Sequence, residues 1–385
     1  MRRGAGRSVI AGYPWFLDWG RDTLIAGRGL IAAGMAEEVR AIVATFAALE
    51  RGGTLPNMLG GDDDSNRDTV DAPLWLAVAA EDAATALGDG VWTTDCGGRP
   101  LVAVLRAIAE AWLAGTANGI RVDHASGLAW SPPHFTWMDT NYPACTPRTG
   151  YPVEIQALWI RLLRQLAAAG APAPRGAWSE WAARAEASFH AFWLEPEGWL
   201  SDCLLAPNGE PAAAAVPDRS LRPNQYLAIA LGLCGGVHAR RACAAGERFL
   251  LVPGAMRTLA PLPVEPPLEI RAADGRMLAD PLRPYQGRYE GDEDTRRKPA
   301  YHNGTAWPWL LPSYCEAVAL AWERAPAAVA TARAWLGSLD ALMDVGCLGH
   351  LPEIVDGDAP HAQRGCDAQA WSVSEALRVW RAIRI

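Results

Sequence analysis

Lysine is almost missing from this chain of 385 residues: Lys298 is the single lysine, and the other 34 of the 35 basic residues are arginines. The 43 acidic residues outnumber the basic ones and give a formal net charge of −8, and the positive charges are scattered along the chain. Binding to nucleic-acid phosphates depends on clustered cations. The charge pattern therefore argues against a nucleic-acid partner.

Long apolar runs are missing as well. No stretch of about 18 uninterrupted apolar residues occurs, as a membrane span requires, and the opening residues lead into no apolar signal core. Half of the residues are nevertheless hydrophobic, which is enough for a large core. We therefore expect a soluble protein without a membrane partner, located in the cytoplasm.

The eight cysteines form no C-x-x-C pair and no repeated spacing, which argues against a disulfide framework or a zinc site. We expect reduced, mostly buried thiols. An acidic run places Asp62, Asp64 and Asn66 at alternate positions, as in a calcium loop. The run lacks the mid-loop glycine of that loop, and Pro73 stands where its twelfth-position glutamate belongs. We therefore expect neither a metal nor a cofactor.

Phenylalanine and tyrosine are scarce, with 6 and 8 residues, whereas the chain has 18 tryptophans. An indole has a wide apolar face and one N–H donor, which suits packing on a sugar ring while bonding to a hydroxyl group. The alternative is that most tryptophans fill a helical core. Trp15, Trp19, Trp137 and Trp307 are the best candidates for sugar contacts because they occur among Gly, Pro and Asp.

The dominant hydrophobic period is helical, since apolar residues recur at spacings of three and four while two-residue alternation is scarce. The segments are residues 21–34, 36–50, 72–88, 100–116, 151–169, 177–193, 223–235, 238–249, 303–323, 326–344 and 366–382. They predict an all-α chain of helical hairpins with the long loops at one end. The irregular stretch 251–302 is expected to form a folded lid or rim. No linker divides residues 1–385, so we expect a single domain.

Two carboxylates stand alone in loops rich in Trp, Gly and Pro: Asp139 follows a Trp-Met pair, and Glu353 follows a Leu-Pro pair. Hydrolysis of a sugar acetal requires one carboxylic acid to protonate the leaving oxygen and one carboxylate to activate water or attack carbon. We hypothesise that these residues are that pair, with a partly desolvated Asp139 as the acid. Asp356 and Asp358 are interpreted as turn formers.

The loop at residues 11–23 combines aromatic residues, two acids and an arginine before a predicted helix. A carboxylate that accepts two hydrogen bonds holds sugar hydroxyls well when it lies beside a forked guanidinium and above an indole. Asp18, Arg21 and Asp22 are therefore candidates for substrate binding. An alternative role for Asp22 is to cap the helix.

Three further positions leave alternatives open. Asp68 belongs either to a solvated acidic turn or, with Asp71, to the edge of the same pocket. Glu154 is either a site residue or merely a first-turn acid that the helix dipole favours. His302 is interpreted as a hydroxyl-binding or structural residue rather than a base.

Six motifs occur in an order that resembles one known family. They are Asp18-Trp19-Gly20-Arg21-Asp22, Thr136-Trp137-Met138-Asp139, Pro152-Val153-Glu154-Ile155, Arg222-Pro223-Asn224-Gln225, Tyr301-His302-Asn303-Gly304-Thr305-Ala306-Trp307-Pro308 and Gln369-Ala370-Trp371-Ser372. Together they resemble the C-terminal amylo-α-1,6-glucosidase domain of glycogen debranching enzymes, over essentially the whole chain.

The resemblance implies an (α/α)6 barrel, related to those of glucoamylases, with a pocket at its loop end. It implies that Asp139 is the general acid and Glu353 the general base of an inverting hydrolysis, which removes α-1,6-linked glucose stubs from glycogen or limit dextrin. The two carboxyl groups are then expected roughly 6.5–9.5 Å apart. The expected partner is glycogen or an α-glucan oligosaccharide. The residues expected to bind it are Trp15, Asp18, Trp19, Arg21, Asp22, Asp68, Trp137, Glu154, His302, Trp307 and Gln369.

The chain departs from the family pattern in three places. We expect no sugar-binding or transferase domain before the barrel, and few residues of this sequence precede the loop that contains Tyr13, where the family has a helix. We therefore expect a barrel that lacks its first helix, or a start codon inside a longer gene. Asn303 stands where glutamine is common. Two alternatives stay open: another exo-α-glucosidase of glucoamylase or trehalase type, and a truncated barrel that binds glycan without hydrolysing it.

Overall fold

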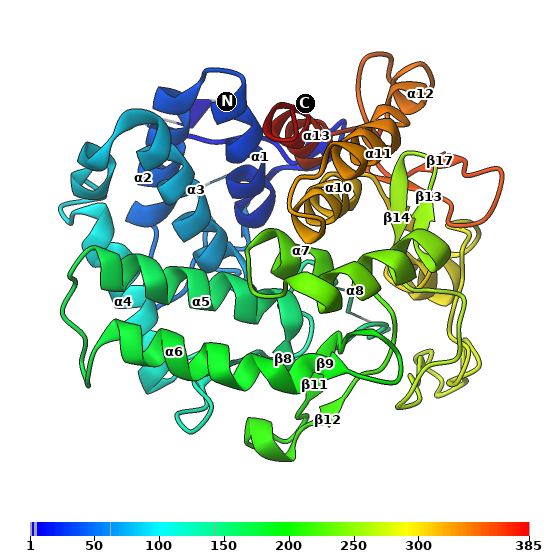
Figure 1. Cartoon of the computed structure of the whole chain (residues 1–385), viewed down its shortest axis with the longest axis horizontal. Helices are drawn as coiled ribbons and strands as arrows, with labels where there is room; N and C mark the ends of the chain where they lie inside the picture. The colour runs from blue at the N-terminus through cyan, green and yellow to red at the C-terminus, as the bar shows by residue number, and fades with distance from the viewer. Residues whose placement is uncertain (1, 4–5, 62, 142, 385) are drawn as a thin grey trace.

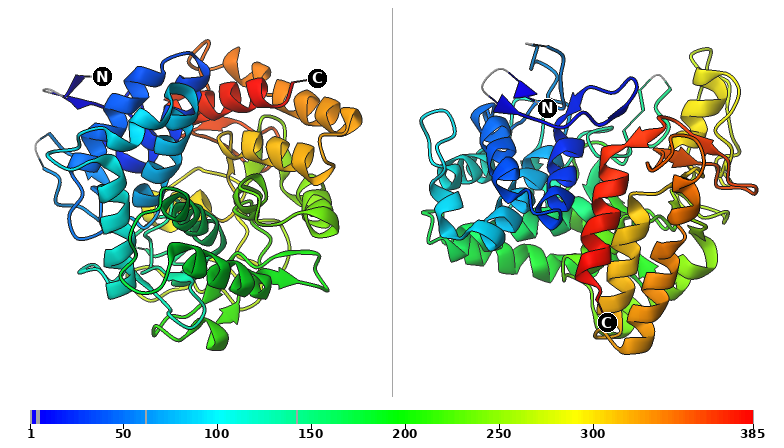
Figure 2. Two further views of the ribbon diagram at one scale, coloured as in Figure 1. Left: turned by 60° about the vertical axis from the view of Figure 1, so that its left-hand side comes forward. Right: turned by 90° about the horizontal axis from the view of Figure 1, so that it is seen from above.

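The computed structural model describes residues 2–3, 6–61, 63–141 and 143–384. Within these residues, six helices form a closed ring in which each packs against the next and the last packs against the first (Figure 1). In chain order these inner helices are α1 (Gly20–Ala32), α3 (Ala72–Leu87), α5 (Val153–Ala168), α7 (Gln225–Ala230), α10 (Leu310–Ala321) and α13 (Ala370–Ala382). The ring closes where α13 lies beside α1 (Figure 2).

Other helices cover the outside of the ring. Helix α2 (Ala36–Ala48) packs on α1 and α3, α4 (Leu101–Ala114) and α6 (Trp178–Phe189) pack on α5, α8 (Gly236–Phe249) packs on α7 and α10, and α11 (Pro326–Gly337) packs on α10 and α13. The shorter helical segments are η1 (Asp89–Thr93), η2 (His190–Phe192), η3 (Ala212–Ala214), η4 (Glu293–Arg297), α9 (Lys298–Tyr301) and α12 (Asp340–Met343).

The burial patterns of the helices explain this division into two layers. In the inner helix α5 every residue from Val153 to Ile160 is buried, so that all of its sides face protein. The outer helix α8 buries a single stripe at the i, i+3, i+4, i+7 spacing, formed by Ala239, Ala242, Cys243 and Gly246. A helix that is apolar all round belongs in the interior, whereas a helix with one apolar stripe packs on the interior from outside.

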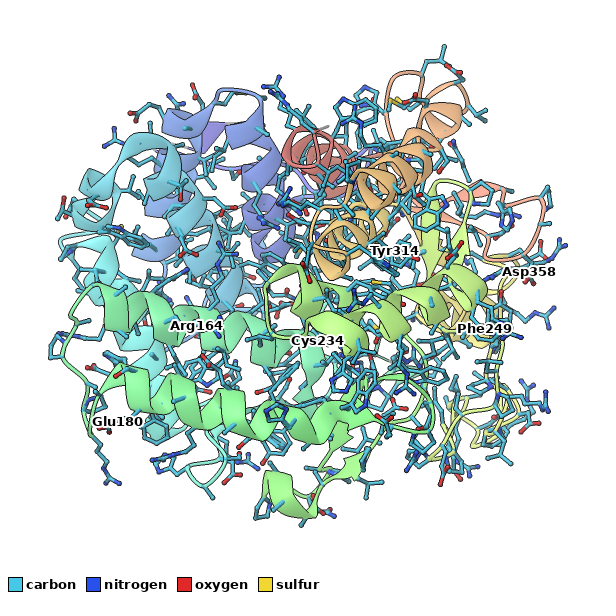
Figure 3. All side chains as sticks on the ribbon, viewed as in Figure 1. Arg164, Glu180, Cys234, Phe249, Tyr314 and Asp358 are labelled. Atoms are coloured by element: carbon cyan, nitrogen blue, oxygen red, sulfur yellow. The ribbon has the colours of Figure 1, made fainter. Side chains whose placement is uncertain are left out.

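Side chains fill the space between the two layers (Figure 3). Tyr314 on α10 is fully buried, whereas Glu180 on α6 is exposed. Trp112 and Trp159 stack in this core with ring centroids 5.3 Å apart, and Trp178 is fully buried too. Core packing thus accounts for several of the 18 tryptophans.

The all-α prediction is wrong in one respect, because the loops contain short antiparallel sheets. The largest sheet has the order β13 (Leu251–Val252), β14 (Ala255–Arg257), β15 (Ala306–Trp307), β16 (Ile354–Val355) and β17 (Gln363–Arg364). A second sheet has the order β12 (Val216–Pro217), β11 (Cys203–Leu205) and β8 (Gly150–Pro152). Strands of two or three residues are too short to produce a visible alternation of apolar and polar residues.

The remaining strands form two-stranded ladders. The pairs are β1 (Arg2–Arg3) with β2 (Gly6–Arg7), β3 (Gly12–Tyr13) with β18 (Ala368–Gln369), β4 (Asp18–Trp19) with β5 (Met58–Leu59), β6 (Arg121–Val122) with β7 (Ala129–Trp130), and β9 (Trp193–Leu194) with β10 (Trp199–Leu200). The described residues before α1 thus form short strands rather than a helix. The β3–β18 ladder holds the segments that lead into α1 and α13 side by side.

Three helix predictions need correction at their boundaries. Helix α10 begins at Leu310 instead of residue 303, because Pro308 favours an extended residue before it and Trp307 belongs to β15. Helix α13 begins at Ala370, since the two preceding residues pair with β3. The segment 223–235 contains only the short helix α7. The residues that α10 and α13 lose precede these helices and include strands β15 and β18.

The prediction of reduced, mostly buried thiols is supported. All eight cysteines are free thiols, and six of them are buried. The irregular stretch 251–302 has little regular structure apart from β13, β14, η4 and α9. No helix within the described residues is long and apolar enough to cross a membrane.

Candidate active site

A pocket of ≈ 370 Å³, including its open mouth, lies at the N-terminal ends of the inner helices. The residues that line the pocket belong to loops preceding α5 and α10 and to the N-terminal parts of α1 and α13 with their preceding loops. They are Ala11, Phe16, Trp19, Arg21, Asp22, Trp137, Asp139, Tyr301, Trp307, Glu353, Gln369 and Trp371.

Glu353 is held at the wall of this pocket with only 3% of its surface exposed. One carboxylate oxygen accepts a hydrogen bond from the Tyr301 hydroxyl, and the other accepts one from the backbone N–H of Cys366 at 2.9 Å. Burial raises the pKa of Glu353 to about 7, although both hydrogen bonds favour the charged form. This carboxyl group is therefore able to gain or lose a proton near neutral pH.

The short strands fix Glu353 relative to the aromatic residues of the pocket. Glu353 directly precedes β16, and Val355 of that strand pairs with Ala306 of β15. Trp307, the other residue of β15, lines the same pocket. The sheet thereby brings together two segments that are far apart in the sequence.

Asp139 is the more accessible of the two carboxylates, with 33% of its side chain exposed. Its Oδ2 atom lies 3.4 Å from Arg21 Nη1, and Oδ1 lies 3.9 Å from Nε2 of the fully buried His302. Arg21 is itself fixed by Asp71, whose Oδ2 lies 2.6 Å from Arg21 Nε. Burial lowers the pKa of His302, so the imidazole is neutral at neutral pH.

Asp22 is a third carboxyl group at the pocket wall. Burial raises its pKa to about 8, although Arg21 opposes this shift. Gln369 donates to Asp22 Oδ1 at 3.1 Å and accepts from the Cys366 thiol at 2.8 Å. At neutral pH Asp22 is therefore protonated and able both to donate and to accept a hydrogen bond.

Three residues that line the pocket each have a buried side-chain nitrogen without a hydrogen-bond partner among the described residues. They are Trp19 Nε1, Trp371 Nε1 and Arg21 Nη2, all of which are buried. Buried donors are normally paired, so an unpaired set in one pocket calls for a ligand or water. Acceptor atoms of a polyhydroxyl molecule are the chemistry that fits this wall.

Packed indoles form the floor of the pocket. The ring of Trp137 meets Trp307 edge-on at 5.3 Å and Trp309 at 5.2 Å. Trp309 in turn stacks on Trp371 at 4.7 Å. Each of these rings is held on more than one side, so the apolar surface offered to a ligand is rigid.

The structure brings together most of the residues proposed from the sequence. Those that line one pocket are Trp19, Arg21, Asp22, Trp137, Asp139, Trp307, Glu353 and Gln369. Asp71, considered as an edge of the pocket, supports Arg21 from behind. His302 lies behind Asp139 rather than in the lining.

Four proposed substrate-binding residues lie elsewhere. Trp15 is 57% exposed and contacts Phe16 edge-on. Asp18 is buried and accepts a hydrogen bond from Ser8. Asp68 is exposed on a surface turn, in agreement with the solvated-turn alternative.

Glu154 is the fourth of these residues and the clearest correction. Its two carboxylate oxygens accept hydrogen bonds from both terminal nitrogens of Arg148, at 2.6 and 2.7 Å, and only 1% of the residue is exposed. A carboxylate so enclosed has no surface left for a sugar. The sequence showed only that Glu154 begins a helix, which does not reveal this partner.

Sequence reasoning did not select four residues of the lining. Tyr301 and Trp371 lie within the motifs that carry the family resemblance, and Phe16 lies in the aromatic loop. These positions gave a usable signal. Ala11 gave none, since it is a small residue whose place depends on the β3–β18 ladder.

Metal-binding side chains are not gathered at this site. Within the described part of the chain, no three or more His, Cys, Asp or Glu residues are grouped so as to hold a metal ion. Of the acidic run, Asp62 lies outside the described residues. Asp64 pairs with Arg51 at 2.9 Å and with Arg67 at 3.4 Å.

The fold is shared with solved glycosidase structures. The GH63 mannosylglycerate hydrolase from Thermus thermophilus matches with a TM-score of 0.63 at 15% identity, over 99% of this chain and 97% of that one. A second protein, described as a glycosidase, matches with a TM-score of 0.63 at 15% identity, over 99% and 92%. A rhamnosidase from Klebsiella oxytoca matches with a TM-score of 0.52 at 14% identity, over 94% and 58%.

The family comparison is more specific. A family model described as amylo-alpha-1,6-glucosidase matches residues 1–266 and 275–378, nearly the whole chain. With the shared fold, this match defines the protein as a glycoside hydrolase. Within that class, the chain belongs to the amylo-alpha-1,6-glucosidase family.

Proposed function

We propose that this protein removes α-1,6-linked glucose stubs from glycogen or limit dextrin by inverting hydrolysis. The family match supports the substrate class. The observation that carries the proposal is the presence of Asp139 and Glu353 in one pocket, together with unpaired buried donors and a rigid indole floor.

Asp139 is proposed as the general acid and Glu353 as the general base. Glu353 takes a proton from a water molecule whose oxygen attacks the anomeric carbon, while the bond to the leaving oxygen breaks and Asp139 protonates that oxygen. A base works best when its pKa lies near the working pH, and the pKa of Glu353 is about 7. Arg21, 3.4 Å from Asp139, stabilises the carboxylate that remains after proton transfer.

Sugar recognition is assigned to the rest of the wall. Trp19, Trp371 and Arg21 offer N–H donors to hydroxyl oxygens. Protonated Asp22 and its partner Gln369 supply both donors and acceptors. A carboxylate separation of roughly 6.5–9.5 Å, wide enough for the attacking water, is part of this proposal.

The helical ring is proposed to be an (α/α)6 barrel. Its support is the closed order of the six inner helices and the placement of α2, α4, α6, α8 and α11 outside them. The cytoplasm is proposed as the compartment, since eight free cysteines suit reducing conditions.

The proposal is tested by the substrate range of the purified protein. Glucose release from a phosphorylase-limit dextrin and from panose is expected to exceed release from maltotriose and trehalose by at least tenfold. Asp68→Asn, a surface acid outside the pocket, serves as the control and keeps full activity. Preference for maltotriose or trehalose would instead identify a different exo-α-glucosidase. Binding of dextrin by folded protein without any glucose release would identify a non-catalytic barrel.

A further inference from the structure

The three residues before Asp139 are each held by a side chain from another part of the chain. Thr136 Oγ1 accepts a hydrogen bond from Arg148 Nη1 at 3.1 Å. Trp137 Nε1 donates to Asn224 Oδ1 at 2.6 Å, and Asn224 Nδ2 contacts Met138 Sδ at 3.4 Å. The loop that carries Asp139 is therefore anchored at three consecutive positions.

The anchoring side chains form one buried network. Arg148 binds Glu154 through both terminal nitrogens and donates through Nε to Asp202 Oδ2 at 2.6 Å. Asp202 Oδ1 accepts a hydrogen bond from Asn224 Nδ2 at 2.7 Å. We propose that the Arg148 network, formed by Arg148, Glu154, Asp202 and Asn224, is a positioning device for Asp139; this inference rests on the proposed function.

Burial and charge make the network rigid. Its four members are at most 3% exposed, and Arg222 lies 3.8 Å from Asp202, so a second guanidinium group stands beside the carboxylates of the network. Charges removed from water are tolerated only when they are paired and hydrogen-bonded, which disfavours any other arrangement of these side chains. Arg148 also adopts a left-handed backbone conformation with φ of 48°, which persists only where the surroundings fix it.

The network acts on the reaction only through the loop. None of its four members lines the pocket that contains Asp139 and Glu353. They come from the loop before α5, from α5 itself, from the turn before β11 and from the start of α7. Proton transfer depends on the placement of the acid to within about 1 Å, and such a displacement costs on the order of a hundredfold in rate. Loss of the network should therefore impair the step that uses Asp139.

Two substrates separate this step from the rest of catalysis. Hydrolysis of panose needs a proton for the leaving oxygen. α-Glucosyl fluoride does not: water oxygen bonds to the anomeric carbon, the C–F bond breaks, fluoride leaves with the electron pair, and Glu353 takes the water proton. A displaced Asp139 should therefore reduce turnover of panose while sparing the fluoride.

The test is Asn224→Leu, which removes the three hydrogen bonds of the amide and keeps the same branching of the side chain. Gln225→Leu is the matched control: Gln225 follows on α7, is equally buried, and bonds to the backbone of Leu200 and Arg222 instead of the Asp139 loop. In Asn224→Leu, kcat for panose is expected to fall roughly 10- to 100-fold. Its KM for panose and its kcat for the fluoride should stay within about threefold. Gln225→Leu should affect both substrates equally.

A second variant tests the same inference if Asn224→Leu does not fold. Glu154→Gln retains the shape of the side chain and one hydrogen bond to Arg148 but removes the negative charge, and it should show the same split between substrates. Equal losses on panose and fluoride in folded variants would overturn the inference while leaving the proposed function intact. A wild-type protein inactive on both substrates would overturn the proposed function, and this inference with it.

Discussion

The hydroxyl group of Tyr301 donates a hydrogen bond to Glu353, and both residues face the same pocket. Tyrosine is a weak acid whose pKa burial and the neighbouring Glu353 raise well above its usual value, so it remains a donor throughout the working pH range. The bond stabilises the charged form of Glu353 against the effect of burial. The balance of these two effects leaves the pKa of Glu353 at about 7.

Tyr301→Phe should therefore shift the pH dependence of the reaction. If Glu353 is the base, kcat/KM falls as the pH drops below about 7, because the base becomes protonated. Removal of the Tyr301 hydroxyl should raise that midpoint by about one pH unit, since a hydrogen bond to a charged group contributes on the order of 1.5 kcal/mol. The measurement is kcat/KM from pH 5 to 9. A loss of activity as the pH rises through 7 would identify Glu353 as the acid instead.

Asp139→Asn and Glu353→Gln should each lower kcat on limit dextrin by about 10²–10⁴-fold, the usual contribution of a general acid or base. Both changes preserve side-chain shape, so circular dichroism should show an unchanged fold. Asp139→Asn should retain more activity on α-glucosyl fluoride than on dextrin, because fluoride leaves without protonation. Near-normal activity of either variant on dextrin would reject the role proposed for that residue.

Asp22→Asn should change how stability depends on pH. The pKa of Asp22 is about 8 in the folded protein and about 3.9 in an unfolded chain, so the folded state binds the extra proton between these values. The contribution of Asp22 to the free energy of unfolding is thus present at low pH, and it is lost as the pH rises through 8. The Tm of the variant relative to wild type should increase from pH 5 to pH 9. For the surface variant Asp68→Asn, the difference in Tm from wild type should not change with pH. The same result for Asp22→Asn would contradict the raised pKa of Asp22.

Substitution of two tryptophans should distinguish a role in substrate binding from a role in stability. Trp371→Phe removes an N–H with no partner in the described protein, and it should lower kcat/KM for dextrin about tenfold, the energy of one hydrogen bond. Trp112→Phe removes an N–H that donates to the carbonyl of Gly53 at 2.9 Å in the core. It should lower the Tm and leave kcat/KM unchanged. Similar effects of the two substitutions on activity would argue against the assigned role of Trp371.

The sequence predicted the helices and most of the pocket because both depend on local signals. Periodic apolar residues identified the segments that form the long helices, and loops rich in Trp, Gly and Asp identified Arg21, Asp139 and Glu353. The starts of α10 and α13 were misplaced because strands β15 and β18 depend on partners far away in the chain.

The positions of two proposed site residues also depend on distant contacts or on exposure. Glu154 was proposed to bind substrate because it lies in a family motif, yet its partner Arg148 is visible only in three dimensions. Conversely, Trp15 stands among pocket residues in the sequence but is largely exposed. A sequence motif indicates which residues gather in one region, whereas their contacts decide which of them touch a ligand.

The most direct test of the central claim is proton NMR of the anomeric signals while the purified protein acts on phosphorylase-limit dextrin. If Asp139 and Glu353 act as the proposed inverting pair, β-glucose appears first and α-glucose accumulates only through mutarotation. Early α-glucose would show retention of configuration and contradict the assigned mechanism.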